Sequence, residues 1–363
     1  MVKKKPQVII ITNTVHGGGA HKLAVSLNQI LGEKYGSRLM VQEYWDDEAN
    51  LPEGDIEVVN RRPYQRQDWF KSLFAVIRSA RTAKLVISGM EGRQDLLAII
   101  AAKIWRIPVF CWVHINVESN WRQKLSRRIA WKLADKVVFC SPDVRDTANF
   151  PVASSKSKVV WNGIDLAGFQ AKAKAELPVG YDEVFQKPTV VTCARIEPVK
   201  DLGKLIRAHA KVVKEAPSHN LLVIGDGSQL ENLKALARDL GLEGSVFFAG
   251  NHRNPGPFLS RSQIFAATSL LEGNPVAMIE AMSLGIPIIS FDNPGSNCTL
   301  AGGEYGVVVH NRDVDVFADK LQELVASPEL QSSWGQKSRE RSQLFTHEQF
   351  AQRWLDLVGE TLK

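Results

Sequence analysis

The chain has few cysteines and no long apolar run. Its four cysteines (Cys111, Cys140, Cys193 and Cys298) are scattered and form no C-x-x-C pair. This argues against a disulfide framework or a thiolate zinc site, and it favours a reducing cytosol. No stretch approaches the roughly 18 apolar residues that a membrane span needs. The apolar run at residues 8–11 ends at Thr12 and enters a glycine turn. It therefore predicts a buried first strand rather than a signal peptide.

The composition is that of an ordinary globular protein with an uneven charge. Of 363 residues, 44% are hydrophobic and 23% are charged, and this length suits two domains of about 150–180 residues. The net charge is +6, but residues 1–168 hold 25 Lys and Arg against 16 Asp and Glu, whereas the remainder holds 20 against 23. The basic half is therefore expected to face something anionic.

Short apolar runs alternate with amphipathic segments in two successive series. Such alternation predicts parallel sheets covered by helices, an α/β fold of two doubly wound domains. The segment from 171 to 188 is predicted to be a linker with one loose helix. The expected strands lie at 8–11, 85–87, 109–113 and 137–140 in the first series, and at 189–194, 220–224, 245–249, 264–267 and 287–290 in the second.

The segment from Glu272 to Pro287 carries the most chemical information. Glu272 follows an expected strand, and Glu280 lies about two turns into the next helix. Between them, Gly273 and Asn274 allow the backbone to approach a ligand. The helix start at Val276, directly after Pro275, offers unpaired N–H groups to a phosphate. An isolated pair of glutamates is usually solvated, but the Gly-Asn-Pro insert and the following Glu-Ala-Met-x-x-Gly-x-Pro favour a functional interpretation.

This segment resembles the E-x7-E signature of the GT4-type (glycosyltransferase group 1) family of retaining glycosyltransferases. The resemblance covers nearly the whole chain and is firmest from 189 to 290. It implies the GT-B fold, in which two doubly wound Rossmann-like domains face a central cleft. It also implies a metal-independent hexosyltransferase of class 2.4, with Glu272 at the donor sugar and Glu280 at the ribose hydroxyls. The donor is expected to be a UDP-sugar, on family frequency alone.

Two basic residues, Arg195 and Lys200, lie five positions apart where a predicted strand ends and a helix begins. A diphosphate leaving group needs its charge neutralised as the glycosidic bond breaks, and fixed cations with helix N–H groups can do this without a metal. An Arg and a Lys at a helix start are more often surface residues. Here the segment resembles the family's Arg and Lys pair, which implies that both residues hold the donor diphosphate.

A glycine-rich loop, His16 to Ala20, follows the first strand. As a dinucleotide-binding fingerprint it is weak, although Glu43 lies near the distance expected of a ribose-binding acid. Lys22 falls on the third glycine position, where helix–strand packing needs a small residue. The loop resembles the family's glycine-rich loop, which implies that Gly18 and Gly19 approach the donor phosphate and the acceptor. The family commonly continues Gly-Gly-Ala-Glu-Arg, whereas His21-Lys22 follows here.

Two further positions follow predicted strands. A lone histidine such as His114 is more often structural, but its place after the strand at 109–113 matches the family's cleft histidine near the donor sugar. The resemblance therefore implies that His114 is catalytic, together with Glu272, Arg195 and Lys200. Gly225, after the strand at 220–224, belongs to the same pattern and is expected to shape the nucleotide pocket.

A D-x-D spacing at Asp313 to Asp315 is typical of metal-dependent transferases. Here it opens an amphipathic stretch, where acids suit a helix N-terminus. The chain shows no convincing His, Asp and Glu cluster either. We therefore expect no metal and no cofactor other than the nucleotide-sugar donor.

The resemblance also divides the chain. Residues 1–168 are expected to form an N-terminal acceptor domain and residues 169–345 a C-terminal donor domain. Residues 346–363 carry apolar side chains at helical spacing. In this fold such a helix returns to pack on the N-terminal domain.

A basic, aromatic segment at 121–132 concerns the acceptor. Leu125, Ile129 and Lys132 lie one turn apart among arginines and lysines. This pattern fits either a core-facing stripe with solvated charges or a face that docks on anionic lipid. The basic balance of the whole half favours peripheral contact at the inner face of the cell membrane. The expected acceptor is then a glycan or a lipid-linked precursor of surface polysaccharide or lipopolysaccharide, with no nucleic-acid partner.

Two alternative functions share the same nucleotide site. A sugar-nucleotide epimerase of this fold needs no acceptor, and a non-catalytic scaffold binds the donor without turnover.

Overall fold

The computed structural model describes residues 6–15, 19–44, 51–61, 63, 65, 68–89, 95–115, 121–148 and 150–363, and it consists of two compact units. Unit 1 is Met1–Gly163 with Glu348–Lys363, and unit 2 is Ile164–His347. The boundaries at 163/164 and 347/348 differ from the expected 168/169 and 345/346. One reason is that α6 (Leu166–Ala173), placed partly in the first domain by the sequence, packs on α9 and α10 of unit 2.

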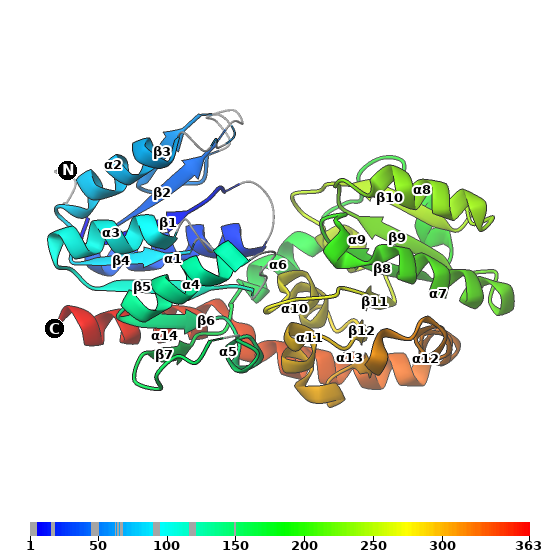
Figure 1. Cartoon of the computed structure of the whole chain (residues 1–363). Helices are drawn as coiled ribbons and strands as arrows, with labels where there is room; N and C mark the ends of the chain where they lie inside the picture. The colour runs from blue at the N-terminus through cyan, green and yellow to red at the C-terminus, as the bar shows by residue number, and fades with distance from the viewer. Residues whose placement is uncertain are drawn as a thin grey trace. The chain divides into compact units, whose positions relative to one another are not determined.

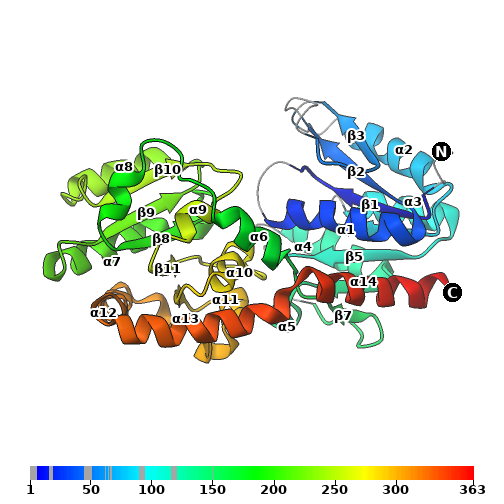
Figure 2. The ribbon, with the colours of Figure 1, turned by 180° about the vertical axis from the view of Figure 1, so that it is seen from behind.

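The described part of unit 1 holds a parallel sheet of seven strands in the order β3-β2-β1-β4-β5-β6-β7. Every residue of β1, β4 and β5 is buried, as expected for strands covered by helices on both faces. Figures 1 and 2 show α2, α3 and α4 on one face of this sheet and α1 and α14 on the other. The strands are β1 Val8–Thr12, β2 Ser37–Glu43, β3 Ile56–Asn60, β4 Leu85–Ser88, β5 Val109–Val113, β6 Lys136–Phe139 and β7 Ser157–Val159; the helices are α1 Gly19–Tyr35, α2 Asp68–Ala80, α3 Asp95–Trp105, α4 Trp121–Leu133, α5 Pro142–Asp146 and α14 His347–Leu362.

Unit 2 holds a parallel sheet of six strands in the order β10-β9-β8-β11-β12-β13. Its core lies between this sheet and the helices that pack on it, with Leu205, Ile206 and Phe317 fully buried. The predicted linker at 171–188 contains the end of α6 and a short 3-10 helix at Asp182–Gln186. The strands are β8 Thr189–Cys193, β9 Asn220–Ile224, β10 Val246–Gly250, β11 Ile264–Ala267, β12 Ile288–Phe291 and β13 Val307–Val309; the other helices are α7 Leu202–Glu215, α8 Leu230–Asp239, α9 Gly256–Leu259, α10 Val276–Ser283, α11 Pro294–Thr299, α12 Val314–Ala326 and α13 Pro328–Ser342.

Both sheets follow the doubly wound strand order 3-2-1-4-5-6, to which unit 1 adds β7 at one edge. The order reverses between β1 and β4 in unit 1 and between β8 and β11 in unit 2. In such sheets ligands bind outside the carboxyl ends of the strands, at the point of reversal. The fold therefore directs attention to the loops that follow β8 and β11.

The C-terminal helix α14 belongs to unit 1. Trp354 is fully buried, and its ring centroid lies 5.1 Å from that of Trp112 on β5. The Phe350 centroid lies 6.0 Å from the same ring, and the Tyr35 hydroxyl on α1 donates to the backbone carbonyl of Leu355 at 3.5 Å. The last residues of the chain thus complete the core formed by the first.

Candidate functional site at the switch point of unit 2

The loops after β8 and β11 are bonded to each other. The Thr268 hydroxyl donates to the carbonyl oxygens of Lys200 and Asp201, each at 3.1 Å. The Leu270 backbone N–H donates to the Val199 carbonyl at 2.8 Å. These bonds fix the segment carrying Lys200 against the segment carrying Glu272.

The side chains of Lys200 and Glu272 meet across this junction. Lys200 Nζ lies 2.6 Å from Glu272 Oε1, and the two side chains are only 16% and 15% exposed. The Ser269 hydroxyl donates to the same carboxylate oxygen at 2.7 Å. Two residues 72 positions apart, both chosen from the sequence, therefore form one charged pair in a largely dehydrated setting, where such contacts are stronger than at an open surface.

The loop after β9 packs beside the β8 loop. The Ala194 N–H donates to the Ile224 carbonyl at 3.0 Å, and the Ile196 N–H donates to the Asp226 carbonyl at 2.8 Å. Gly225 has φ +141°, and a Cβ there would lie 1.9 Å from the Ala194 carbonyl oxygen. Glycine is thus required for the close approach of the two loops.

Arg195 lies on the loop fixed in this way. Its side chain is exposed. The nearby Glu197 carboxylate accepts hydrogen bonds from the Ser228 N–H at 3.2 Å and from the Ser228 hydroxyl at 2.7 Å. These bonds, with a smaller contribution from the Arg195 charge, lower the pKa of Glu197. Arg195 and Lys200 therefore stand on one short loop, one extended towards solvent and one held by Glu272.

Helix α10 begins directly after Pro275, and its first turn carries Val276. Glu280, on the second turn, is 7% exposed. Asn274 is buried, and its amide donates to the Thr299 hydroxyl at 3.1 Å. This side chain therefore ties the loop before α10 to α11.

Two residues that the sequence did not single out complete the loop. Ser269 bonds Glu272, and the Gly295 N–H donates to the Glu272 carbonyl at 3.0 Å. A Cβ at Gly295 would lie 2.5 Å from the Glu272 carbonyl carbon. Gly295 follows β12, so no motif spacing relates it to Glu272.

Unit 1 holds three of the residues chosen from the sequence. Gly18 lies outside the described residues, while Gly19 is the first residue of α1. His114 follows β5, and its ring centroid lies 4.2 Å from that of Trp112. Burial, and secondarily the neighbouring His21 on α1, lowers the pKa of His114 to about 3. The imidazole is therefore neutral at physiological pH.

The D-x-D segment caps a helix, as predicted. Asp313 Oδ1 accepts from the backbone N–H groups of Asp315 and Val316 at 2.8 and 3.2 Å, and the Asp315 carboxylate pairs with Lys211. Among the described residues, no group of three or more His, Cys, Asp and Glu side chains is placed to hold a metal ion. Across the same residues, none of the helices combines the length and apolar character required to cross a bilayer.

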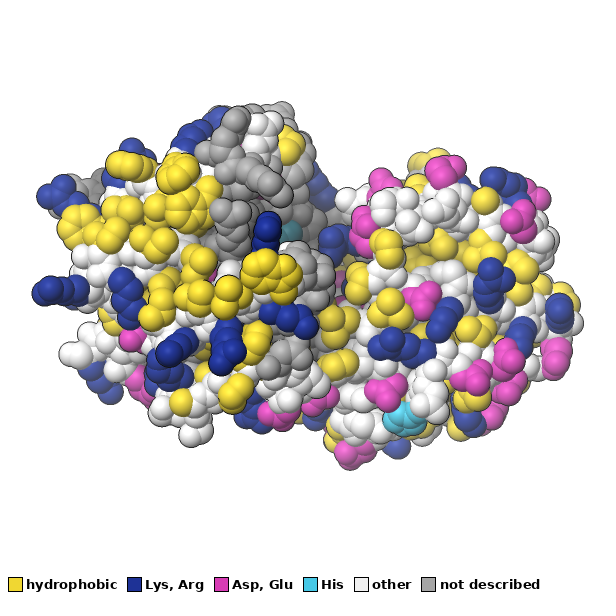
Figure 3. Space-filling view, viewed as in Figure 1, with side chains coloured by type: hydrophobic (Ala, Val, Ile, Leu, Met, Phe, Trp, Pro, Cys, Tyr) yellow, Lys and Arg dark blue, Asp and Glu magenta, His cyan; other side chains and the backbone are white. Residues whose placement is uncertain are grey.

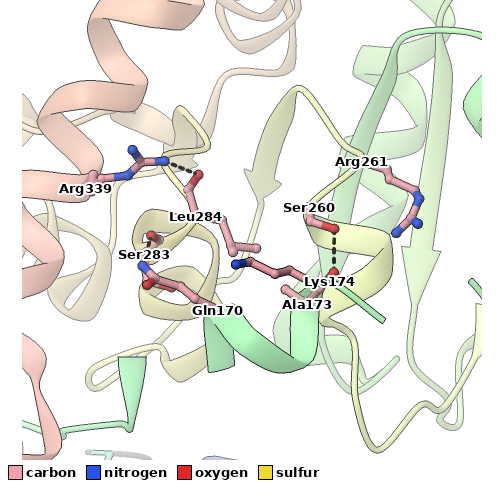
Figure 4. Close-up of a pocket in the computed structure, with 8 residues that line it drawn as sticks. All are labelled: Gln170, Ala173, Lys174, Ser260, Arg261, Ser283, Leu284 and Arg339. Atoms are coloured by element: carbon pink, nitrogen blue, oxygen red, sulfur yellow. Dashed lines mark hydrogen bonds between the residues drawn. The ribbon is translucent and has the colours of Figure 1, made fainter. Parts of the chain in front are cut away.

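A cavity of about 660 Å³ lies elsewhere in unit 2 (Figure 4). Ser283 and Leu284 line it from the C-terminal end of α10, so it lies away from the helix start at Val276. Arg339 Nη2 donates to the Leu284 carbonyl at 3.0 Å, and Arg261 Nη1 donates to the Pro257 carbonyl at 2.9 Å. Both arginines satisfy local carbonyl groups, and none of the residues predicted for the site lines this cavity.

The fold and the sequence have known counterparts. Residues 41–167 match the model of "Glycosyltransferase Family 4", and residues 176–341 match that of "Glycosyl transferases group 1". The structure of HepE from Anabaena, solved in complex with UDP and glucose, matches with a TM-score of 0.81 at 17% identity, over 98% of this chain and 99% of that one. The GT-B fold class is thereby confirmed.

Two relatives extend the comparison. The amylovoran biosynthesis glycosyltransferase AmsD of Erwinia amylovora is 24% identical over 97% of this chain and 99% of its own length. The N-acetylgalactosamine-N,N'-diacetylbacillosaminyl-diphospho-undecaprenol 4-alpha-N-acetylgalactosaminyltransferase of Campylobacter jejuni is 24% identical over 54% of this chain and 52% of its own. The chain belongs to the GT4-type, group 1 family of glycosyltransferases. It is a glycosyltransferase of polysaccharide or glycan biosynthesis.

Proposed function

We propose that the protein transfers a hexose from a UDP-sugar, with retention and without a metal, to a glycan or lipid-linked acceptor of surface polysaccharide or lipopolysaccharide. The contact that carries this proposal is the largely buried pair of Lys200 and Glu272, 16% and 15% exposed, at the point where the strand order of unit 2 reverses. A nucleotide site is expected at this position in a doubly wound sheet.

The donor diphosphate is proposed to bind at the β8 loop and the start of α10. Arg195 supplies an exposed guanidinium, and Lys200 becomes available when a phosphate competes with Glu272 for its ammonium group. The first turn of α10, from Val276, adds N–H groups and the positive end of the helix dipole. These charges neutralise the leaving group as the bond to the sugar breaks, and no metal is needed for that step.

The two glutamates are proposed to bind different parts of the donor. Glu280 accepts hydrogen bonds from the ribose hydroxyls, and Glu272, released from Lys200, accepts from the hydroxyls of the transferred sugar. Gly225 leaves room for the nucleotide beside the β8 loop. His114, neutral because its pKa is about 3, contributes to transfer from unit 1 by hydrogen bonding rather than by charge.

Retention is proposed to follow from attack on the face that the diphosphate leaves. The bond between the anomeric carbon and the phosphate oxygen breaks, and the acceptor oxygen bonds to that carbon on the same face. The acceptor proton passes to an oxygen of the departing diphosphate. The cations Arg195 and Lys200 stabilise this product, so their removal lowers the rate of transfer as well as the affinity for the donor.

The comparisons support the donor and the acceptor class. HepE, of matching fold, is known with UDP and glucose. The names of the two relatives specify amylovoran biosynthesis and a diphospho-undecaprenol acceptor. The basic balance of residues 1–168 suits an anionic, membrane-borne acceptor, with this half in peripheral contact with the bilayer.

The test is titration calorimetry with UDP, GDP, ADP and CMP, in buffer with magnesium and in buffer with a chelator. We expect chelator-resistant binding of UDP and at least a tenfold loss in Lys200→Ala, as for a charged hydrogen bond. The matched control is Lys234→Ala, an exposed lysine paired with Glu231 on α8. Wild-type UDP affinity in a folded Lys200→Ala variant would refute the assignment.

Product analysis then separates the rival functions. Incubation with a UDP-sugar alone yields an epimeric nucleotide sugar if the chain is an epimerase. Incubation with donor and a diphospho-undecaprenol-linked glycan yields an extended glycan if the proposal holds. Donor binding without either product identifies a non-catalytic scaffold.

A further inference from the structure

Helix α4 of unit 1 turns apolar side chains outwards. Trp121, Leu125, Ile129 and Leu133 are spaced four residues apart and are 67%, 49%, 40% and 43% exposed. The helix buries Ser126, Arg127, Ala130 and Trp131 instead. Residues four apart share one face of a helix, so these four side chains form a continuous apolar stripe. The stripe therefore faces solvent and not the core of unit 1.

The two neighbouring helices extend this stripe into a face. Phe70 and Phe74, four residues apart on α2, are 70% and 77% exposed. Ile104 and Trp105 at the end of α3 are also exposed. Helix α3 packs against both α2 and α4, and the Trp105 indole N–H donates to the Ile77 carbonyl on α2 at 2.8 Å. We call the exposed surface of α2, α3 and α4 the three-helix face.

The charge on the three-helix face has one sign. The only acids in these helices, Asp68 and Asp95, are buried, and each accepts a hydrogen bond, from the Gln65 N–H at 2.8 Å and from the Ser88 hydroxyl at 2.6 Å. In Figure 3, yellow side chains gather over α2, α3 and α4 with dark blue ones among and around them, and magenta is sparse there. The exposed Lys and Arg residues of the three helices are Lys71, Arg78, Lys103, Arg122, Lys124, Arg128 and Lys132.

We infer that the three-helix face docks on an anionic lipid bilayer. Exposed aromatic and aliphatic side chains bordered by Lys and Arg are the composition of a helix that lies in the membrane interface. Basic residues near a bilayer of anionic lipids are attracted to it, each strengthening binding about fivefold. The inference deepens the proposed peripheral contact of the basic half, because it names the helices and side chains that make this contact.

Charge decides between a bilayer and a second copy of the chain. In a two-fold dimer the same patch faces itself, so the lysines and arginines of one face would oppose those of the other. Like charges brought together in this way repel. An anionic bilayer meets the same face with opposite charge and receives its apolar side chains as well.

The experiment measures binding of the full chain to sedimenting vesicles. One set contains phosphatidylcholine with phosphatidylglycerol, and the other contains phosphatidylcholine alone. We expect wild-type protein to bind the anionic vesicles, and to bind less as salt rises, because screening weakens the basic contribution. The apolar variant Trp121→Gln/Leu125→Gln/Ile129→Gln should lose at least about tenfold in vesicle affinity through reduced burial of apolar area. The charge variant Lys124→Gln/Arg128→Gln/Lys132→Gln should lose more on anionic vesicles than on neutral ones.

The matched control carries two exposed apolar residues of unit 2, changed as Val316→Gln/Leu330→Gln, which are 45% and 41% exposed. Its vesicle affinity should equal that of the wild type. The inference is wrong if wild-type protein ignores anionic vesicles, or if the apolar variant binds them as the wild type does. It is also wrong if the wild type is a dimer that the apolar variant converts to a monomer.

UDP affinity, measured in the same samples, separates this inference from the proposed function. Normal UDP binding with lost vesicle binding in the apolar variant supports the docking face. Vesicle binding by a wild-type chain that fails to bind UDP would contradict the proposed donor and leave the docking face standing.

Discussion

The outer helices of the two units use the same periodicity for opposite purposes. Helix α7 of unit 2 buries its apolar residues, among them Leu205, Ile206 and Val212. Helix α4 of unit 1 exposes Trp121, Leu125 and Ile129. Both helices cover a parallel sheet of the same strand order. An apolar stripe at helical spacing therefore predicts a helix, but the direction of the stripe depends on what the helix packs against.

The carboxyl edges of the two sheets also differ. In unit 2 the edge brings opposite charges together, as Lys200 and Glu272 show. In unit 1 the residue chosen at the corresponding edge is His114, whose depressed pKa keeps it neutral at physiological pH. A charged edge suits a diphosphate, whereas a neutral histidine suits hydrogen bonding to a sugar or an acceptor hydroxyl.

The largest expected effect concerns the helix that completes unit 1. Trp354→Ala on α14 removes a fully buried ring from its contacts with Trp112 and Phe350, and such a loss costs about 3–5 kcal/mol. Hydrogen exchange should show lost protection in β5 and α14, while the sheet of unit 2 keeps its protection. Trp121→Ala, which removes an exposed ring, is the control and should leave the exchange of β5 unchanged. Equal loss of protection in both units would show that they unfold together.

The next effect tests the close loop packing in unit 2. Gly225→Ala puts a Cβ 1.9 Å from the Ala194 carbonyl oxygen at φ +141°, and we expect a loss of about 3 kcal/mol from combined strain and overlap. Gly180→Ala is the matched control, because Gly180 also has positive φ, +98°, but nothing lies within 4 Å of its Cβ position. Its cost should be about 1 kcal/mol from the backbone alone.

Urea unfolding monitored by hydrogen exchange in β8 and β9 measures both glycine variants. UDP affinity should fall in Gly225→Ala and stay unchanged in Gly180→Ala. Equal destabilisation by the two substitutions would mean that the β8 and β9 loops are free to separate.

Much of the fold followed from the sequence where strands are uniformly apolar. The strands predicted near 8–11, 109–113 and 220–224 are present as β1, β5 and β9. Strand β2, Ser37–Glu43, was missed because it mixes charged and polar residues with apolar ones. Its Arg38 pairs with Asp55 at 3.1 Å and with Glu57 at 3.3 Å. These ion pairs with residues outside β2 compensate the Arg38 charge, which made the segment look unlike a strand in the sequence.

The site residues followed from motifs, but their contacts did not. The positions of Lys200 and Glu272 are visible as separate motifs, whereas their pairing requires β8 and β11 to be neighbours in the sheet. Gly295 and Ser269 have no motif at all and are found only through their bonds to Glu272. The direction of the α4 stripe was likewise undetermined, because an inward and an outward stripe share one periodicity.

The smallest expected effect is a pH dependence that both units share through different histidines. His209 on α7 is fully buried, and burial lowers its pKa to about 4, as burial lowers that of His114 to about 3. Unfolded chains bind a proton at each histidine below about pH 6.5, whereas the folded protein does not. Stability is therefore fully present above pH 6.5 and is lost as the pH falls towards the folded pKa.

For His209 alone, this linkage amounts to about 2 kcal/mol between pH 7 and pH 5. The measurement is the free energy of unfolding of unit 2 at each pH, for wild type and for His209→Gln, which carries no titrating group. The substitution should flatten the pH dependence of unit 2 and leave the acid sensitivity of β5 in unit 1, beside His114, as it was. If the free energy of unfolding of unit 2 varied with pH equally in wild type and His209→Gln, His209 would be binding its proton in the folded state. Burial would then not lower its pKa.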